Sequence, residues 1–80
     1  MQRQGLPDGT KNIISTQVRK LRKARGLSMS YLAAKMQLVG RDVGISSIFG
    51  IERGTRFVSD IELKAIAQIF EVSCDELFDK

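Results

Sequence analysis

The side chains of this 80-residue sequence that could do chemistry are mostly cationic or hydroxylic. The chain contains no histidine and one cysteine, Cys74. Catalytic triads and Cys–His pairs need an imidazole base, and tetrahedral zinc needs several Cys or His ligands. Asp75 and Glu76 follow Cys74 and disfavour a thiolate, so we expect an inert thiol. We therefore predict that the protein is not an enzyme and that it holds no metal or other cofactor.

Basic residues are concentrated in the first half of the chain. Residues 1–41 carry nine Lys and Arg and one acid, a net charge of +8, whereas residues 42–80 carry four basic and eight acidic residues, a net charge of −4. Five of the seven residues in 19–25 are basic. This asymmetry is typical of a protein with a polyanionic partner, although a solvated helix face would give the same charges.

The first helices are predicted from apolar spacing and from their ends. Ile14, Val18 and Leu21 recur at i, i+4 and i+7, and Gly26 ends that segment. Ser28 is a suitable N-cap for a second helix. The inward-facing residues of the second helix are predicted to be Leu32, Ala33 and Met36.

Glycines and capping boxes predict the remaining elements. Residues 37–44 contain two glycines and predict a loop, followed by a third helix over 45–53 that ends at Gly54. Capping boxes precede a fourth and a fifth helix, Ser59 with Glu62 and Ser73 with Glu76. We therefore predict an all-α fold with five helices.

The ends and the hydropathy of the chain predict its organisation. Residues 1–12 hold the only proline and few apolar residues, and we expect them to form a flexible tail before a single domain over 13–80. No apolar span of membrane length and no signal-peptide pattern is visible. These patterns predict a cytoplasmic protein without a membrane partner.

Four segments resemble a known family when they are taken in this order: VRKLRKARGLS, YLAAKM, SSIFGIERG and LKAIAQIFEVSCDELF. Over residues 17–78 the chain resembles the phage-repressor (Cro-type, XRE-like) helix-turn-helix family. The resemblance implies a five-helix lambda-repressor-like domain that binds double-stranded DNA as a transcriptional repressor or similar regulator of bacterial or phage origin. It also implies a homodimer, formed in solution or only on DNA, with Leu77 and Phe78 as candidate contacts.

The resemblance also assigns roles to particular residues. Arg22 and Glu52 correspond to a partly buried ion pair of the family. The base-reading candidates lie on the outward face of the third helix: Ile45, Ser46, Ser47, Phe49 and Gly50. The phosphate-binding candidates precede or flank that helix: Lys23, Arg25, Ser28, Met29, Ser30, Arg41, Arg53, Thr55 and Arg56.

The sequence departs from the family pattern where specificity would arise. Met29 stands where the family often has glutamine, and the third helix offers no Arg, Lys, Asn or Gln on its outward face for bidentate bonds to bases. The connection before that helix is longer than the family's usual turn. Two alternatives therefore stay open. One is the antitoxin of a toxin–antitoxin pair, and the other is a protein-interaction module that docks an unknown partner through Ile45, Phe49 and Gly50.

Overall fold

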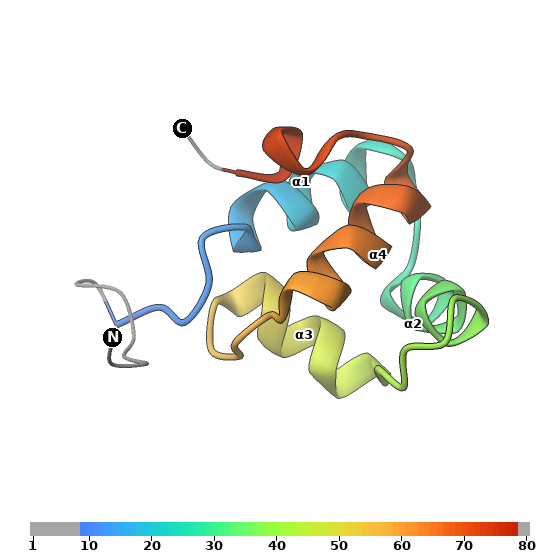
Figure 1. Cartoon of the computed structure of the whole chain (residues 1–80), viewed down its shortest axis with the longest axis horizontal. Helices are drawn as coiled ribbons and strands as arrows, with labels where there is room; N and C mark the ends of the chain where they lie inside the picture. Colours follow the sequence, from blue (N-terminus) through green and yellow to red (C-terminus); the bar gives the residue numbers. More distant parts are fainter. Residues whose placement is uncertain (1–8, 79–80) are drawn as a thin grey trace.

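The computed structural model describes residues 9–78, and every regular element in that range is helical (Figure 1). The elements are α1 (Ser15–Ala24), α2 (Met29–Leu38), α3 (Ile45–Arg53), α4 (Asp60–Phe70) and a 3-10 helix, η1 (Cys74–Leu77). The all-α prediction is confirmed, but the prediction of five α-helices is wrong. The last element has only four residues before the chain becomes extended at Phe78, which is too short for a ladder of i→i+4 hydrogen bonds.

The predicted helix ends are formed by short-range hydrogen bonds and by glycine. The Ser28 hydroxyl accepts the Tyr31 N–H at 3.0 Å, and the Ser59 hydroxyl accepts the Glu62 N–H at 3.1 Å. The Glu62 carboxylate in turn accepts the Ser59 N–H, which completes the capping box. α3 ends at Gly54, whose φ of 77° lies in the left-handed region that glycine adopts at low cost.

The core lies where α4 meets α2 and where α1 and α2 meet α3 (Figure 1). Its fully buried side chains come from all five elements and from one loop residue: Val18, Leu32, Met36, Val43, Ile48, Ile51, Ile66, Phe70 and Leu77. Val43 anchors the connection before α3, which is shorter than the predicted 37–44 loop because α2 continues to Leu38. Leu77 is fully buried within its own domain, so the prediction that it contacts a second copy is wrong.

The segment before α1 belongs to the folded domain. The Lys11 N–H donates to the Gly54 carbonyl at 2.7 Å. The Asn12 amide donates to the carbonyls of Ile51 at 3.2 Å and Arg56 at 2.9 Å. Lys11 and Asn12, the last two residues of the predicted tail over 1–12, therefore fasten α3 and its following turn. Residues 1–8 of that tail lie outside the described residues.

Candidate nucleic-acid interface

The exposed face of α3 carries three of the five predicted base-reading residues. The side chains of Ile45 and Phe49 keep 54% and 47% of their surface exposed, and Ser46 is also exposed. Ser47 and Gly50 are only partly accessible. The face that α3 offers to a partner is therefore apolar at two positions and hydroxylic at one.

Gly50 packs closely against the turn that follows α3. A Cβ atom at this position would lie 3.2 Å from the Arg56 Cβ and 3.5 Å from the Thr55 hydroxyl oxygen. The Thr55 N–H also donates to the Gly50 carbonyl at 2.9 Å. The protein's own turn therefore lies close to the position of a side chain here, so a larger residue would have to displace it slightly.

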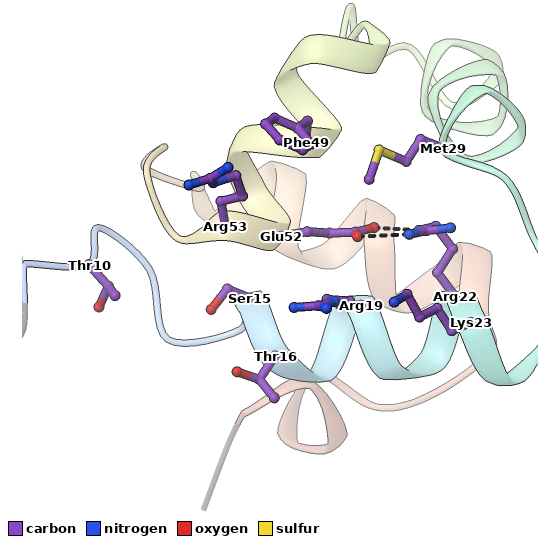
Figure 2. A pocket seen from close by; sticks show the side chains of 10 residues that line it. All are labelled: Thr10, Ser15, Thr16, Arg19, Arg22, Lys23, Met29, Phe49, Glu52 and Arg53. Carbon is purple, nitrogen blue, oxygen red and sulfur yellow. Dashed lines mark hydrogen bonds and ion pairs between the residues drawn. The ribbon is translucent and has the colours of Figure 1, made fainter.

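A groove of about 650 Å³ separates α1 from α3 and reaches the first residue of α2 (Figure 2). We call it the α1–α3 groove and define it by its lining: Thr10, Ser15, Thr16, Arg19, Arg22, Lys23, Met29, Phe49, Glu52 and Arg53. Arg22 from α1 and Glu52 from α3 meet in it, and Arg53 is directed towards Phe49 (Figure 2). The groove lies beside the exposed face of α3, because Phe49 belongs to both.

The Arg22–Glu52 ion pair joins the two walls of the groove. Arg22 Nε and Nη2 donate to the two Glu52 carboxylate oxygens at 2.6 and 3.0 Å, and Nη1 donates to the Leu27 carbonyl at 2.8 Å. The hydrogen bonds to Glu52 raise the pKa of the Arg22 guanidinium above its usual value. The Glu52 side chain is only 2% exposed and that of Arg22 11%, so this pair fixes α1 against α3.

Three further cations line the groove and give it a net positive charge. Arg19 and Lys23 extend from α1, and Arg53 extends from the last turn of α3 with its guanidinium 5.2 Å from the centre of the Phe49 ring. Within residues 9–78 none of these three side chains is in an ion pair. Since Arg22 and Glu52 neutralise each other, the groove presents about three uncompensated positive charges.

The start of α2 adjoins this groove through Met29. The Ser28 hydroxyl is engaged by the Tyr31 N–H and lies 3.1 Å from the Ser30 hydroxyl, which confirms Ser28 as the N-cap. The N–H groups of Met29 and Ser30 belong to the first turn, where a helix has no acceptor of its own. Together with the helix dipole they favour an anion at this end.

Two of the predicted phosphate-binding arginines are held by the domain itself. Arg25 donates to the Phe70 carbonyl and stacks over the Phe70 ring at 5.5 Å. Arg56 forms two hydrogen bonds with the Glu62 carboxylate, at 2.9 and 3.0 Å, which raise the pKa of Arg56 and lower that of Glu62. The Arg25 contact fastens the end of α4, and the Arg56 contact fastens the turn before α4. Each contact would compete with phosphate binding by its arginine.

Arg41 and Thr55 also lie outside the α1–α3 groove. Arg41 lines a shallow depression with Gln37, Gly40 and Asp42, and Thr55 is exposed in the turn after α3. Arg19, by contrast, lines the groove although the sequence interpretation did not select it. Its i→i+4 spacing to Lys23 places both on one face of α1 and is the signal that identifies it.

The helix-turn-helix arrangement and its cationic groove define a domain of the DNA-binding class. A helix-turn-helix family model matches residues 18–77, and the chain therefore belongs to the helix-turn-helix family of sequence-specific DNA-binding regulators. The restriction-modification controller protein C.AhdI from Aeromonas hydrophila is 35% identical, with a TM-score of 0.70 over 81% of this chain and 91% of that one. The DNA-binding domain of BldD is 28% identical, with a TM-score of 0.69 over 84% of this chain and 90% of that one.

No curated protein matches the chain in the comparison. Among the described elements, none of the helices combines the length and hydrophobicity that a membrane span requires.

Proposed function

We propose that this protein is a transcriptional repressor that inserts α3 into the major groove of double-stranded DNA. The observation that carries the proposal is the position of the exposed α3 face beside the cationic α1–α3 groove. In helix-turn-helix complexes the second helix of the motif lies in the major groove and the flanking elements meet the phosphate backbone. α3 is the second helix of the motif here, and the start of α2 is the flanking element.

In this proposal Ile45, Ser46 and Phe49 contact the base edges. Apolar side chains contact the thymine methyl group, and a serine hydroxyl makes a single hydrogen bond to either kind of base. None of the three can form the bidentate bonds that give the strongest discrimination. Much of the specificity would therefore come from the shape and deformability of the DNA.

A homodimer on an inverted repeat completes the proposal. Two copies related by two-fold symmetry would place their α3 helices about 34–36 Å apart, one turn of DNA, or a multiple of that distance. C.AhdI is a restriction-modification controller, and its 35% identity over most of this chain supports a regulatory function over the antitoxin alternative.

Selection from a random duplex pool, followed by fluorescence anisotropy at several salt concentrations, tests the proposal. We expect a selected site with two-fold symmetry and a log–log salt dependence that corresponds to several released counterions. Ser46→Ala should change the preference at one base position in each half-site more than it changes overall affinity. The matched control is Ser73→Ala, because Ser73 lies at the start of η1, away from α3.

Failure to bind any duplex at low salt would contradict the proposal. It would favour the second candidate, a protein-interaction module, because Ile45 and Phe49 are among the exposed large apolar residues of residues 9–78. A selected site with unchanged base preferences in Ser46→Ala would contradict only the assigned reading face.

A further inference from the structure

The segment just before α1 holds the end of α3 and the turn after it (Figure 1). The Asn12 amide nitrogen donates to the carbonyls of Ile51 at 3.2 Å and Arg56 at 2.9 Å. The Lys11 N–H donates to the Gly54 carbonyl, which lies between them in the sequence, at 2.7 Å. We propose that Asn12 is a positioning residue for DNA binding, which fixes the last turn of α3 and the turn that follows it. The inference rests on the insertion of α3 into DNA proposed above.

Thr10 and Lys11 pack against the same turn. A Cβ atom on Gly54 would lie 3.2 Å from the Thr10 methyl carbon, so Thr10 approaches the backbone of the turn closely. The Lys11 ammonium lies 5.1 Å from the centre of the Phe57 ring, within the range of a cation–π contact. Gly54 is buried as a result of this packing. Residues 10–12 therefore cover the turn over 54–57.

The end of α3 gains hydrogen bonds from outside the helix. The last four carbonyls of a helix have no partner within it, and the Ile51 carbonyl is one of these. The Gly54 and Arg56 carbonyls lie between α3 and α4, in a stretch without regular structure. A carbonyl that is partly buried costs free energy when it has no donor. Asn12 and Lys11 supply these donors, which stabilises one conformation of the turn.

The Asn12 side chain joins this turn to the start of α1. Its amide oxygen accepts the Ile14 N–H at 3.1 Å, while its nitrogen donates to two carbonyls near the end of α3. A primary amide has two donor hydrogens and an acceptor oxygen, and all of them are used here. The turn that Asn12 fixes carries the exposed side chains of Arg53 and Thr55, two residues that are candidates for DNA contact. Asn12 therefore sets the place of these side chains relative to α1.

The first turns of α3 do not depend on Asn12. Ile48 is fully buried, and the Arg22–Glu52 ion pair fixes the helix against α1. Without Asn12 we expect the turn after α3 to adopt several conformations while the rest of the helix keeps its place. Apparent affinity falls with the population of the conformation that is competent to bind. The base preference assigned to Ser46, at the start of α3, should not change.

Fluorescence anisotropy with the selected duplex tests this role. We expect Asn12→Ala to bind about three- to tenfold more weakly than the wild type. If Asn12 acts through the turn, the same substitution should weaken binding by less than about twofold in a protein that already carries Arg53→Ala and Thr55→Ala. In a protein that carries Ser46→Ala, it should weaken binding by its full factor.

A conservative variant separates the two ends of the Asn12 side chain. Asn12→Ser keeps a short acceptor for the Ile14 N–H, but its hydroxyl is too short to reach both carbonyls near the end of α3. We therefore expect Asn12→Ser to bind DNA as weakly as Asn12→Ala. If Asn12→Ser instead binds like the wild type, the role of Asn12 lies at the start of α1 and the proposal is wrong.

Two comparisons separate positioning from general stability. Ile66→Val removes a buried methyl group from α4, so it lowers the stability of the domain but should leave DNA affinity unchanged. In the free protein, Asn12→Ala should accelerate amide hydrogen exchange at Gly54 and Thr55 more than in α4, whereas Ile66→Val should not. If Ile66→Val loses as much affinity as Asn12→Ala, the loss reflects stability and the positioning role is wrong.

The failures of the two proposals are distinguishable. If the wild-type protein binds its duplex and Asn12→Ala binds it equally well, the positioning role fails and the proposed function stands. A full loss from Asn12→Ala in the protein with Arg53→Ala and Thr55→Ala also contradicts the role. If the wild-type protein binds no duplex, both proposals fail.

Discussion

Replacing Glu52 by alanine should cost this domain a large part of its stability. Glu52→Ala leaves the Arg22 guanidinium without its counter-charge at a position where the arginine side chain is only 11% exposed. Removing one partner of a buried ion pair typically costs about 3–5 kcal/mol. Arg22 keeps some contact with water and its hydrogen bond to the Leu27 carbonyl, so we expect the lower end, about 3 kcal/mol. A domain of 80 residues has a free energy of unfolding of only about 4–12 kcal/mol.

Two companion variants separate charge from packing. Glu52→Gln keeps one acceptor oxygen for Arg22 but loses the charge, so it should cost about 1–2 kcal/mol, the difference between a charged and a neutral hydrogen bond. The double variant Arg22→Met with Glu52→Leu removes both charges and keeps apolar volume. Because buried pairs recover little beyond their desolvation cost, the double variant should lie within about 1 kcal/mol of the wild type.

Urea unfolding followed by circular dichroism at 222 nm measures these differences, since the chain has no tryptophan for fluorescence. A loss of 3 kcal/mol also lowers the melting temperature of a domain of this size by on the order of 15 °C. The reasoning is refuted if Glu52→Ala loses less than about 1 kcal/mol. It is also refuted if the double variant is as unstable as Glu52→Ala, because the cost would then reflect lost packing instead of an unpaired charge.

Three further predictions concern the turns and caps. Gly54→Ala and Gly26→Ala each place a side chain at positive φ, which costs about 1–2 kcal/mol of stability. Of the two added Cβ atoms, only the one at position 54 meets other atoms, at 3.2 Å, so urea unfolding should show the larger loss of stability for Gly54→Ala. Equal losses would contradict this. The hydrogen bonds from Arg56 lower the folded-state pKa of Glu62. The stability that they add is therefore complete above the usual carboxylate pKa of about 4.3 and is lost as the pH falls through the lowered pKa. Glu62→Gln should flatten this part of the stability–pH profile, and an unchanged profile would contradict the prediction. Asn12→Ala removes the donor to two carbonyls and should lower the free energy of unfolding by about 2 kcal/mol, whereas a loss below about 0.5 kcal/mol would show that the segment is not fastened by this side chain.

The helices of this domain could be predicted from the sequence because their signals are local. Ser28 and Ser59 bond to N–H groups three residues away, and Gly54 acts through its own backbone angle. The bounds predicted for α3, 45–53, agree with the structure. The Arg22–Glu52 contact could be predicted only through the family resemblance, since 30 residues separate its partners.

The partners of individual cations could not be predicted because they depend on tertiary contacts. Arg25 donates to the Phe70 carbonyl, 45 residues away, and the Arg56 guanidinium bonds to the Glu62 carboxylate across the turn before α4. A count of charges treats an arginine that is bonded within the domain and one that faces solvent as equal. The basic surface predicted from the sequence therefore overstated the contributions of Arg25 and Arg56 and left out the place of Arg19 in the groove.

The composition of α3 serves the fold as well as a partner, and this bears on how the protein would select DNA. Gly50 packs against the turn at 55–56, where a Cβ atom would lie 3.2 Å from the Arg56 Cβ. Phe49 is exposed and also packs against the Arg53 guanidinium. In the proposed complex, Ile45 and Ser46 are then the exposed α3 side chains left to contact bases alone. In that complex, a helix with so few hydrogen-bonding side chains would take much of its specificity from the shape of the DNA.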